Sequence, residues 1–137
     1  MFDHEILCVL AIAMCTAAWA IALAHTAQRS RRPRFPLSKA EQRASTLLKE
    51  WLTREQRIQY EQQGYFDVLG SETRTRYRIR YSPQMNVDQL DKQGRRVAVL
   101  CFLPETHLPV CDVMLSQKIM LENDEVAALS VANRRYC

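Results

Sequence analysis

The chain has 137 residues, a net charge of +4 and 47% hydrophobic residues. This length suits one ordinary domain and leaves little for anything else within these residues. Only three glycines and five prolines are present, which argues against long disordered stretches. The apolar residues concentrate in residues 6–24, and the positive charge concentrates in the residues that follow.

The most apolar segment is residues 6–24, which contains no charged side chain and one hydroxyl, that of Thr16. Nineteen helical residues span about 28 Å, close to the roughly 30 Å hydrocarbon core of a bilayer. We therefore predict a transmembrane helix over 6–24, preceded by an extracytoplasmic N-terminus at 1–5. Positive charge beside a span favours the cytoplasmic side, and the span is followed by Arg29, Arg31, Arg32 and Arg34. The predicted location is the cytoplasmic (inner) membrane, single-pass, with the domain in the cytoplasm.

A cleaved signal peptide followed by an exported soluble domain is the alternative to this anchor. Ala22-Leu23-Ala24 has the small-x-small form that signal peptidases accept. Asp3 and Glu5 argue against it, because a signal peptide begins with basic residues. The basic cluster after the apolar run would also have to cross the membrane.

Residues 25–37 form a basic linker in which Pro33 and Pro36 prevent the membrane helix from continuing. Residues 25–43 hold six Lys/Arg and one Glu, a net charge of +5, whereas residues 44–137 carry only +1. Basic residues beside a membrane attract anionic lipid headgroups by about 1 kcal/mol each. We expect Arg29, Arg31, Arg32 and Arg34 to contact headgroups, to act as a topology signal, or both.

After the basic linker, the sequence predicts two helices, then a series of strands and a closing helix. Two capping boxes, in which Ser or Thr is followed three residues later by Glu or Gln, predict helices over 39–51 and 54–63, starting after Ser38 and Thr53. The first helix has a broad apolar side made of Ala40, Ala44, Leu47, Leu48 and Trp51.

Strands are predicted next, at 65–69, 73–81, 87–91 and 95–103. Residues 73–81 alternate strictly, with arginines on one face and Thr73, Thr75, Tyr77, Ile79 and Tyr81 on the other, as in a half-buried strand.

A closing helix is predicted over 113–132, with Asp112 as its N-cap. The sequence leaves open whether residues 122–125 break it. The residues expected to face the core are Leu115, Ile119, Val126 and Leu129. The predicted fold class is α+β: a transmembrane helix, then a domain at 38–137 with two helices, a three- to four-stranded antiparallel sheet and a C-terminal helix.

The clearest candidate binding surface is the row of arginines on the strand at 73–81. Alternate strand residues stand about 6.6–6.8 Å apart, so the row spans about 20 Å, and its members are Arg74, Arg76, Arg78 and Arg80. One interpretation is a surface for an anionic partner, either an acidic protein or anionic lipid. The other is a solvated face whose arginines pair with Asp67, Asp88, Asp91 or helical Glu side chains. Nucleic acid is disfavoured, because no aromatic residue shares the arginine face and the domain is nearly neutral.

Cys101, His107 and Cys111 form the candidate site for the alternative function, a metal or redox site that Cys137 could complete. The spacing contains no CxxC pair, which structural zinc sites usually have. Cys111 with His107 as its base is a weaker catalytic alternative. The carboxylate pairs Asp67/Glu72 and Asp88/Asp91 fit turns and ion pairs equally well. We therefore predict no enzyme, no catalytic residue and no cofactor.

These patterns together favour a single-pass membrane protein whose small cytoplasmic domain binds a partner. The expected partners are the membrane and an acidic protein or anionic lipid.

Overall fold

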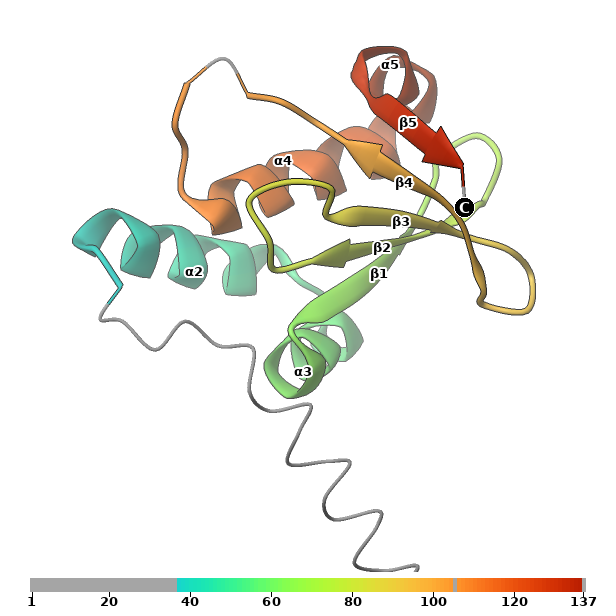
Figure 1. The fold of residues 1–137 in the computed structure, drawn as a ribbon. Helices are drawn as coiled ribbons and strands as arrows, with labels where there is room; N and C mark the ends of the chain where they lie inside the picture. Colours follow the sequence, from blue (N-terminus) through green and yellow to red (C-terminus); the bar gives the residue numbers. More distant parts are fainter. Residues whose placement is uncertain (1–36, 105, 137) are drawn as a thin grey trace, which may run out of the picture. The chain divides into compact units, whose positions relative to one another are not determined.

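The computed structural model describes residues 37–104 and 106–136. This region is an α+β domain with four helices and a five-stranded antiparallel sheet (Figure 1). In chain order its elements are α2 (Lys39–Trp51), α3 (Arg54–Gln63), β1 (Tyr65–Leu69), β2 (Arg76–Arg80), β3 (Val87–Leu90), β4 (Arg96–Cys101), α4 (Val110–Asn123), α5 (Glu125–Val131) and β5 (Asn133–Tyr136).

Helices α2 and α3 begin and end where their local signals predict. Ser38 Oγ accepts a hydrogen bond from the Glu41 N–H at 3.2 Å, and the Glu41 carboxylate accepts one from the Ser38 N–H at 3.0 Å. The same reciprocal pair, at 3.2 Å in both directions, joins Thr53 and Gln56. Two otherwise unpaired N–H groups are thus satisfied at each helix start.

The sheet is a meander in which every strand pairs antiparallel with its neighbour in the chain. The first four strands match the predicted ones, but the second is shorter than residues 73–81 because Arg74 has a φ of 58°. That left-handed conformation belongs to a turn rather than a strand. The fifth strand, β5, was not predicted, since its sequence NRRY is polar and every residue in it is exposed. The expected three- to four-stranded sheet is therefore corrected to five strands.

The C-terminal helix differs from its prediction at its start. Helix α4 begins at Val110 after Pro109, so Asp112 lies in the first turn and is not the N-cap. Pro109 has a φ of −53° and Asp112 donates its N–H to the Pro109 carbonyl at 3.0 Å. The helix can start earlier than predicted because the proline leads the chain directly into its first turn.

The possible break at residues 122–125 is present at Asp124, which ends α4 and caps α5. Its φ of −149° is not helical, and its carboxylate accepts the Ala127 N–H at 2.9 Å. The break changes which residues face the core. Ile119 and Val126 are 38% and 66% exposed, so their predicted burial was wrong.

The hydrophobic core lies between the sheet and one layer of helices. Helix α2 packs on α4, and both lie on the same side of the sheet (Figure 1). Tyr77 and Ile79 face this core, as the alternation of β2 predicts. The apolar side predicted for α2 is only partly buried, since Ala44 and Leu48 are covered whereas Leu47 and Trp51 are exposed. The largest apolar side chains that are almost fully buried are Tyr77, Phe66, Leu48, Ile79, Leu100, Met114 and Leu121.

Helix α3 covers the free edge of β1. The Gln59 side chain accepts the Asp67 N–H at 2.8 Å, and Gln56 donates its amide to the Asp67 carbonyl at 2.9 Å. These two backbone groups face away from β2 and would otherwise be open to another strand. One edge of the sheet is therefore blocked by side chains of a helix.

Candidate binding surface on the sheet

The strand register places alternating charges on the face of the sheet opposite the core. Asp67, Arg78 and Asp88 lie in one row across β1, β2 and β3, and the row continues through Val99 to Arg135 on β5. Their neighbours along the strands, such as Tyr77, are buried on the core side. We call this surface the outer sheet face and define it by Asp67, Arg76, Arg78, Arg80, Asp88, Arg96 and Arg135.

Arg78 is held by a paired carboxylate and an aromatic ring. Its Nε and Nη2 donate to the two oxygens of Asp67 at 2.8 and 3.1 Å, which is the bidentate geometry that suits a guanidinium. The guanidinium carbon also lies 4.0 Å from the centroid of the Tyr65 ring. The hydrogen bond to Asp67 raises the pKa of Arg78 despite the opposing effect of burial. This side chain is fixed in position and largely neutralised.

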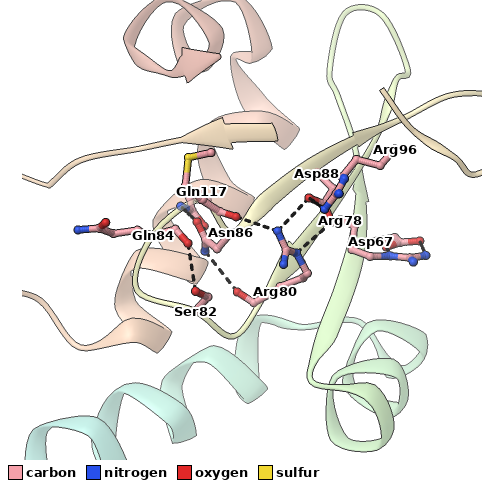
Figure 2. Close-up of polar contacts among 10 residues, drawn as sticks. Asp67, Arg78, Arg80, Ser82, Gln84, Asn86, Asp88, Arg96 and Gln117 are labelled. Carbon is pink, nitrogen blue, oxygen red and sulfur yellow. Dashed lines mark hydrogen bonds and ion pairs between the residues drawn. The ribbon is translucent and has the colours of Figure 1, made fainter. Parts of the chain in front are cut away.

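Arg80 forms the second pair, with Asp88 (Figure 2). Its Nη2 donates to Asp88 Oδ1 at 2.9 Å and to the Met85 carbonyl at 2.8 Å. Nε lies 2.9 Å from Asp88 Oδ2, an ion-pair distance, but its N–H is not directed at any acceptor. Arg96 contributes a longer contact, 3.8 Å from Nη1 to the same carboxylate. Asp88 is 6% exposed, so the two arginines cover it from solvent.

The remaining arginines of the predicted row differ from these two. Arg74 lies in the turn before β2, is exposed, and does not belong to the outer sheet face. Arg76 stays in the row, and its Nη2 approaches Gly94 so closely that a Cβ there would lie 2.8 Å away. Among the described residues, no carboxylate lies within ion-pair distance of Arg74, Arg76 or Arg135. The structure thus brings three of the four predicted arginines together.

The outer sheet face carries a net charge of +3, because five arginines share it with two aspartates. The predicted partners Asp67 and Asp88 do pair with the arginine row. Asp91 does not, since it binds Arg95 at 2.8 Å. Within the described residues, Arg76 and Arg135 have no carboxylate within ion-pair distance, and Arg96 makes only the 3.8 Å contact with Asp88. Solvent-exposed guanidiniums in such an arrangement can accept carboxylate or phosphate groups.

A buried pair of amides supports the end of this surface. Asn86 and Gln117 donate to each other's side-chain oxygens, both at 2.9 Å, and are 1% and 2% exposed (Figure 2). Asn86 also accepts the Arg80 N–H through its carbonyl at 2.8 Å. The β2–β3 connection is therefore fixed to α4, which holds the backbone of Arg80 in place. No local sequence signal predicts this pair, because its members are 31 residues apart.

A second polar cluster, which was not predicted from the sequence, surrounds Glu125. This residue is 1% exposed. Its carboxylate accepts hydrogen bonds from the Tyr77 hydroxyl at 2.7 Å, the Thr73 hydroxyl at 2.6 Å, and the N–H groups of Thr73 and Glu72 at 2.7 and 3.1 Å. Burial raises the pKa of Glu125, but the hydrogen bonds from Thr73 and the others outweigh it and leave the pKa below the ordinary 4.5. All of these donors belong to the β1–β2 turn or to β2, so the Glu125 carboxylate joins α5 to this part of the sheet.

Cys101, His107 and Cys111 are not arranged as a metal site. Cys101 and Cys111 are buried, whereas His107 is exposed. Within residues 37–104 and 106–136, no three His, Cys, Asp or Glu side chains could hold a metal ion together; Cys137 lies outside them. Cys111 sits inside the first turn of α4, 3.5 Å from the Tyr60 hydroxyl, and burial raises the pKa of its thiol. A raised pKa opposes the thiolate that the nucleophilic alternative requires.

The predicted membrane segments lie outside the described residues. These are the span at 6–24, Arg29, Arg31, Arg32 and Arg34. None of the helices that the structure describes is long and apolar enough to cross a membrane.

Comparison with protein-family models, with curated proteins and with solved structures finds no match for this chain.

Proposed function

We propose that this chain is a single-pass membrane protein whose cytoplasmic domain binds an acidic segment of another protein through the outer sheet face. The observation that carries the proposal is the incomplete neutralisation of this face. Arg78 and Arg80 are fixed by Asp67 and Asp88. Arg96 makes only a long contact with Asp88, at 3.8 Å, and Arg76 and Arg135 have no carboxylate within ion-pair distance among the described residues. Of the described helices, α2 and α4 pack on the opposite side of the sheet (Figure 1).

The rigidity of the surface favours a protein ligand over a fluid lipid surface. Asp67 and Tyr65 hold Arg78, and Asp88 with the Met85 carbonyl holds Arg80. Beyond Arg78 on the same face, Arg76 and Arg96 face each other across Leu90, which pairs with both. Guanidiniums held in fixed positions can pair with carboxylates that are regularly spaced, as they are along an extended acidic peptide segment. Single-stranded nucleic acid fits less well, because Tyr65, an aromatic ring beside this surface, is already covered by Arg78.

The anchor in this proposal is the apolar segment at 6–24. It would hold the domain at the cytoplasmic surface, with the basic linker at 25–37 next to the headgroups. The support for this part is the charge distribution of the sequence, in which the +5 of residues 25–43 follows the span. Tethering would raise the local concentration of the domain near other membrane proteins.

A titration with a defined ligand tests the sheet-face part of the proposal. The full chain in zwitterionic nanodiscs is titrated with a fluorescent, Glu-rich peptide and with its Gln-substituted equivalent. We expect binding of the acidic peptide alone, weakened by added salt. Replacing Arg76→Gln and Arg96→Gln should weaken binding about tenfold or more, since a hydrogen bond to a charged group contributes about 1.5–3 kcal/mol.

The matched control removes the same charge from the helical side of the domain. Lys39→Gln with Arg43→Gln changes two exposed cations on α2. If this control weakens peptide binding as much as the sheet variant, the affinity reflects net charge and the proposed surface is wrong. Anionic vesicles and oligothymidylate are included as competitors with the Lys39→Gln/Arg43→Gln variant, and displacement of the peptide by either would replace the acidic protein as the ligand of the outer sheet face.

A further inference from the structure

One side of α2 is exposed and combines cations with large apolar side chains. Arg43, Leu47 and Trp51 follow at intervals of four residues and so lie along one side of the helix. Leu47 is 42% exposed and Trp51 is 58% exposed. Lys39 continues the same row by one turn toward the N-terminus. We call these four residues, Lys39, Arg43, Leu47 and Trp51, the α2 row.

The α2 row lies outside the buried core of the domain. The helix buries Ala44 and Leu48 against the core, while Leu47 and Trp51 lie to the side of them. Within the described residues, no carboxylate is within ion-pair distance of Lys39 or Arg43. Glu50 is also exposed beside the row, and Glu41 is engaged in the capping box with Ser38. The row therefore presents two unpaired cations at one end and two large apolar side chains at the other.

We infer that the α2 row lies in the headgroup region of an anionic bilayer, an inference that rests on the membrane anchor of the proposed function. Tryptophan is enriched at membrane interfaces, because its ring is apolar and its N–H is polar. Lysine and arginine beside it can bind lipid phosphates. A helix of this composition lies in the plane of the interface, with the apolar side chains toward the acyl boundary.

The position of α2 in the chain indicates that the α2 row contacts the membrane surface. Residues 25–38 are the fourteen residues between the predicted span and the start of α2. A fully extended chain of that length reaches about 50 Å, so α2 cannot leave the neighbourhood of the membrane surface. It is the described element that follows the basic linker directly. A membrane surface is thus always within reach of this helix, whereas the outer sheet face belongs to the opposite side of the domain.

Tryptophan fluorescence in nanodiscs separates this inference from the anchor itself. The chain has two tryptophans, Trp19 and Trp51, so Trp19→Phe leaves a reporter on α2 and Trp51→Phe leaves a reporter in the predicted span. Each variant of the full chain is placed in nanodiscs containing phosphatidylglycerol, with bromine atoms at a shallow or a deep position of the acyl chains. We expect Trp51 to be quenched about twofold more strongly by shallow than by deep bromines, and Trp19 to be quenched by deep ones.

Two further variants test the geometry and the chemistry. A tryptophan introduced by Val126→Trp, in a background with Trp19→Phe and Trp51→Phe, reports from α5 at a site that is 66% exposed, against 58% for Trp51, and should not be quenched. Lys39→Gln with Arg43→Gln should reduce the quenching of Trp51. Discs without anionic lipid should do the same.

The possible failures are distinguishable. Quenching of Trp19 without quenching of Trp51 overturns the inference and leaves the anchor intact. Absence of quenching at both positions overturns the anchor as well. Equal quenching from positions 51 and 126, or quenching of Trp51 that is unchanged without anionic lipid, overturns the assignment to the α2 row.

Discussion

The hydroxyl of Tyr77 donates a 2.7 Å hydrogen bond to the carboxylate of Glu125, so the first residue of α5 is bound to the second residue of β2. Both residues are 1% exposed. The two are 48 residues apart in the chain. This contact fixes the position of the short helix that precedes β5, and it leads to the first two predictions.

Replacing Glu125→Ala should lower the free energy of unfolding by about 3 kcal/mol, because the buried hydroxyl of Tyr77 and the partly buried donors of Thr73 lose their acceptor. The measurement is urea unfolding of the domain in the full chain, followed by circular dichroism. Val126→Ala is the matched control on the same helix, since Val126 is 66% exposed. Equal losses for the two variants would contradict the role given to Glu125.

The stability should also depend on pH through Glu125. Its pKa is lowered in the folded state, so its stabilisation is complete above the ordinary Glu pKa of 4.5 and is lost as the pH falls from there through the folded pKa. The Glu125→Gln variant should therefore lose less stability than the unmodified chain when the pH is lowered from about 6 to about 3. This range is chosen because it includes the pKa of an unperturbed Glu, roughly 4.3. An unchanged acid dependence would mean that other carboxylates cause it.

Gly70 should tolerate a side chain only when Glu125 is absent. A Cβ at Gly70 would lie 2.3 Å from Glu125 Cδ, so Gly70→Ala should cost about 1–3 kcal/mol by overpacking. In the Glu125→Ala background, the added methyl group should cost much less. The coupling energy from the double-mutant cycle measures this contact, and strictly additive losses would contradict it.

The β1 edge should become available for pairing when its covering side chains are shortened. Gln56→Ala with Gln59→Ala exposes the N–H and carbonyl of Asp67, and an open edge pairs with other chains. We expect a loss of about 1 kcal/mol per hydrogen bond together with concentration-dependent self-association, measured by light scattering. Gln62→Ala changes an exposed residue of the same helix and should leave the protein unchanged; association of this control as well would point to another surface.

The parts of the fold that were predictable are those with local signals. The capping boxes at Ser38 and Thr53 set the starts of α2 and α3, and the alternation of Tyr77 and Ile79 identified the inward face of β2. Strand β5 has no such signal, because its four exposed residues form a strand only by pairing with β4. Long-range pairing of this kind overrides weak local preference.

The candidate site was predictable in part for the same reason. Period-two alternation placed Arg76, Arg78 and Arg80 on one face, and Asp67 and Asp88 were among their expected partners. Arg74 was misplaced, since its positive φ is set by the turn around Gly70, whose carbonyl accepts the Arg74 N–H at 3.2 Å. Arg96 and Arg135 lie on the outer sheet face because of the register of β4 and β5. The sequence does not specify the register of such polar strand segments.

The most direct test of the proposed function is to map the bound ligand on the domain. Amide chemical shifts of the full chain in zwitterionic nanodiscs are recorded with and without the Glu-rich peptide. We predict that the largest changes occur at β2 and β4, around Arg76 and Arg96, and that they disappear in the Arg76→Gln/Arg96→Gln variant. Changes confined to α2, or no changes at peptide concentrations that saturate binding, would contradict the assignment of the outer sheet face as the binding surface.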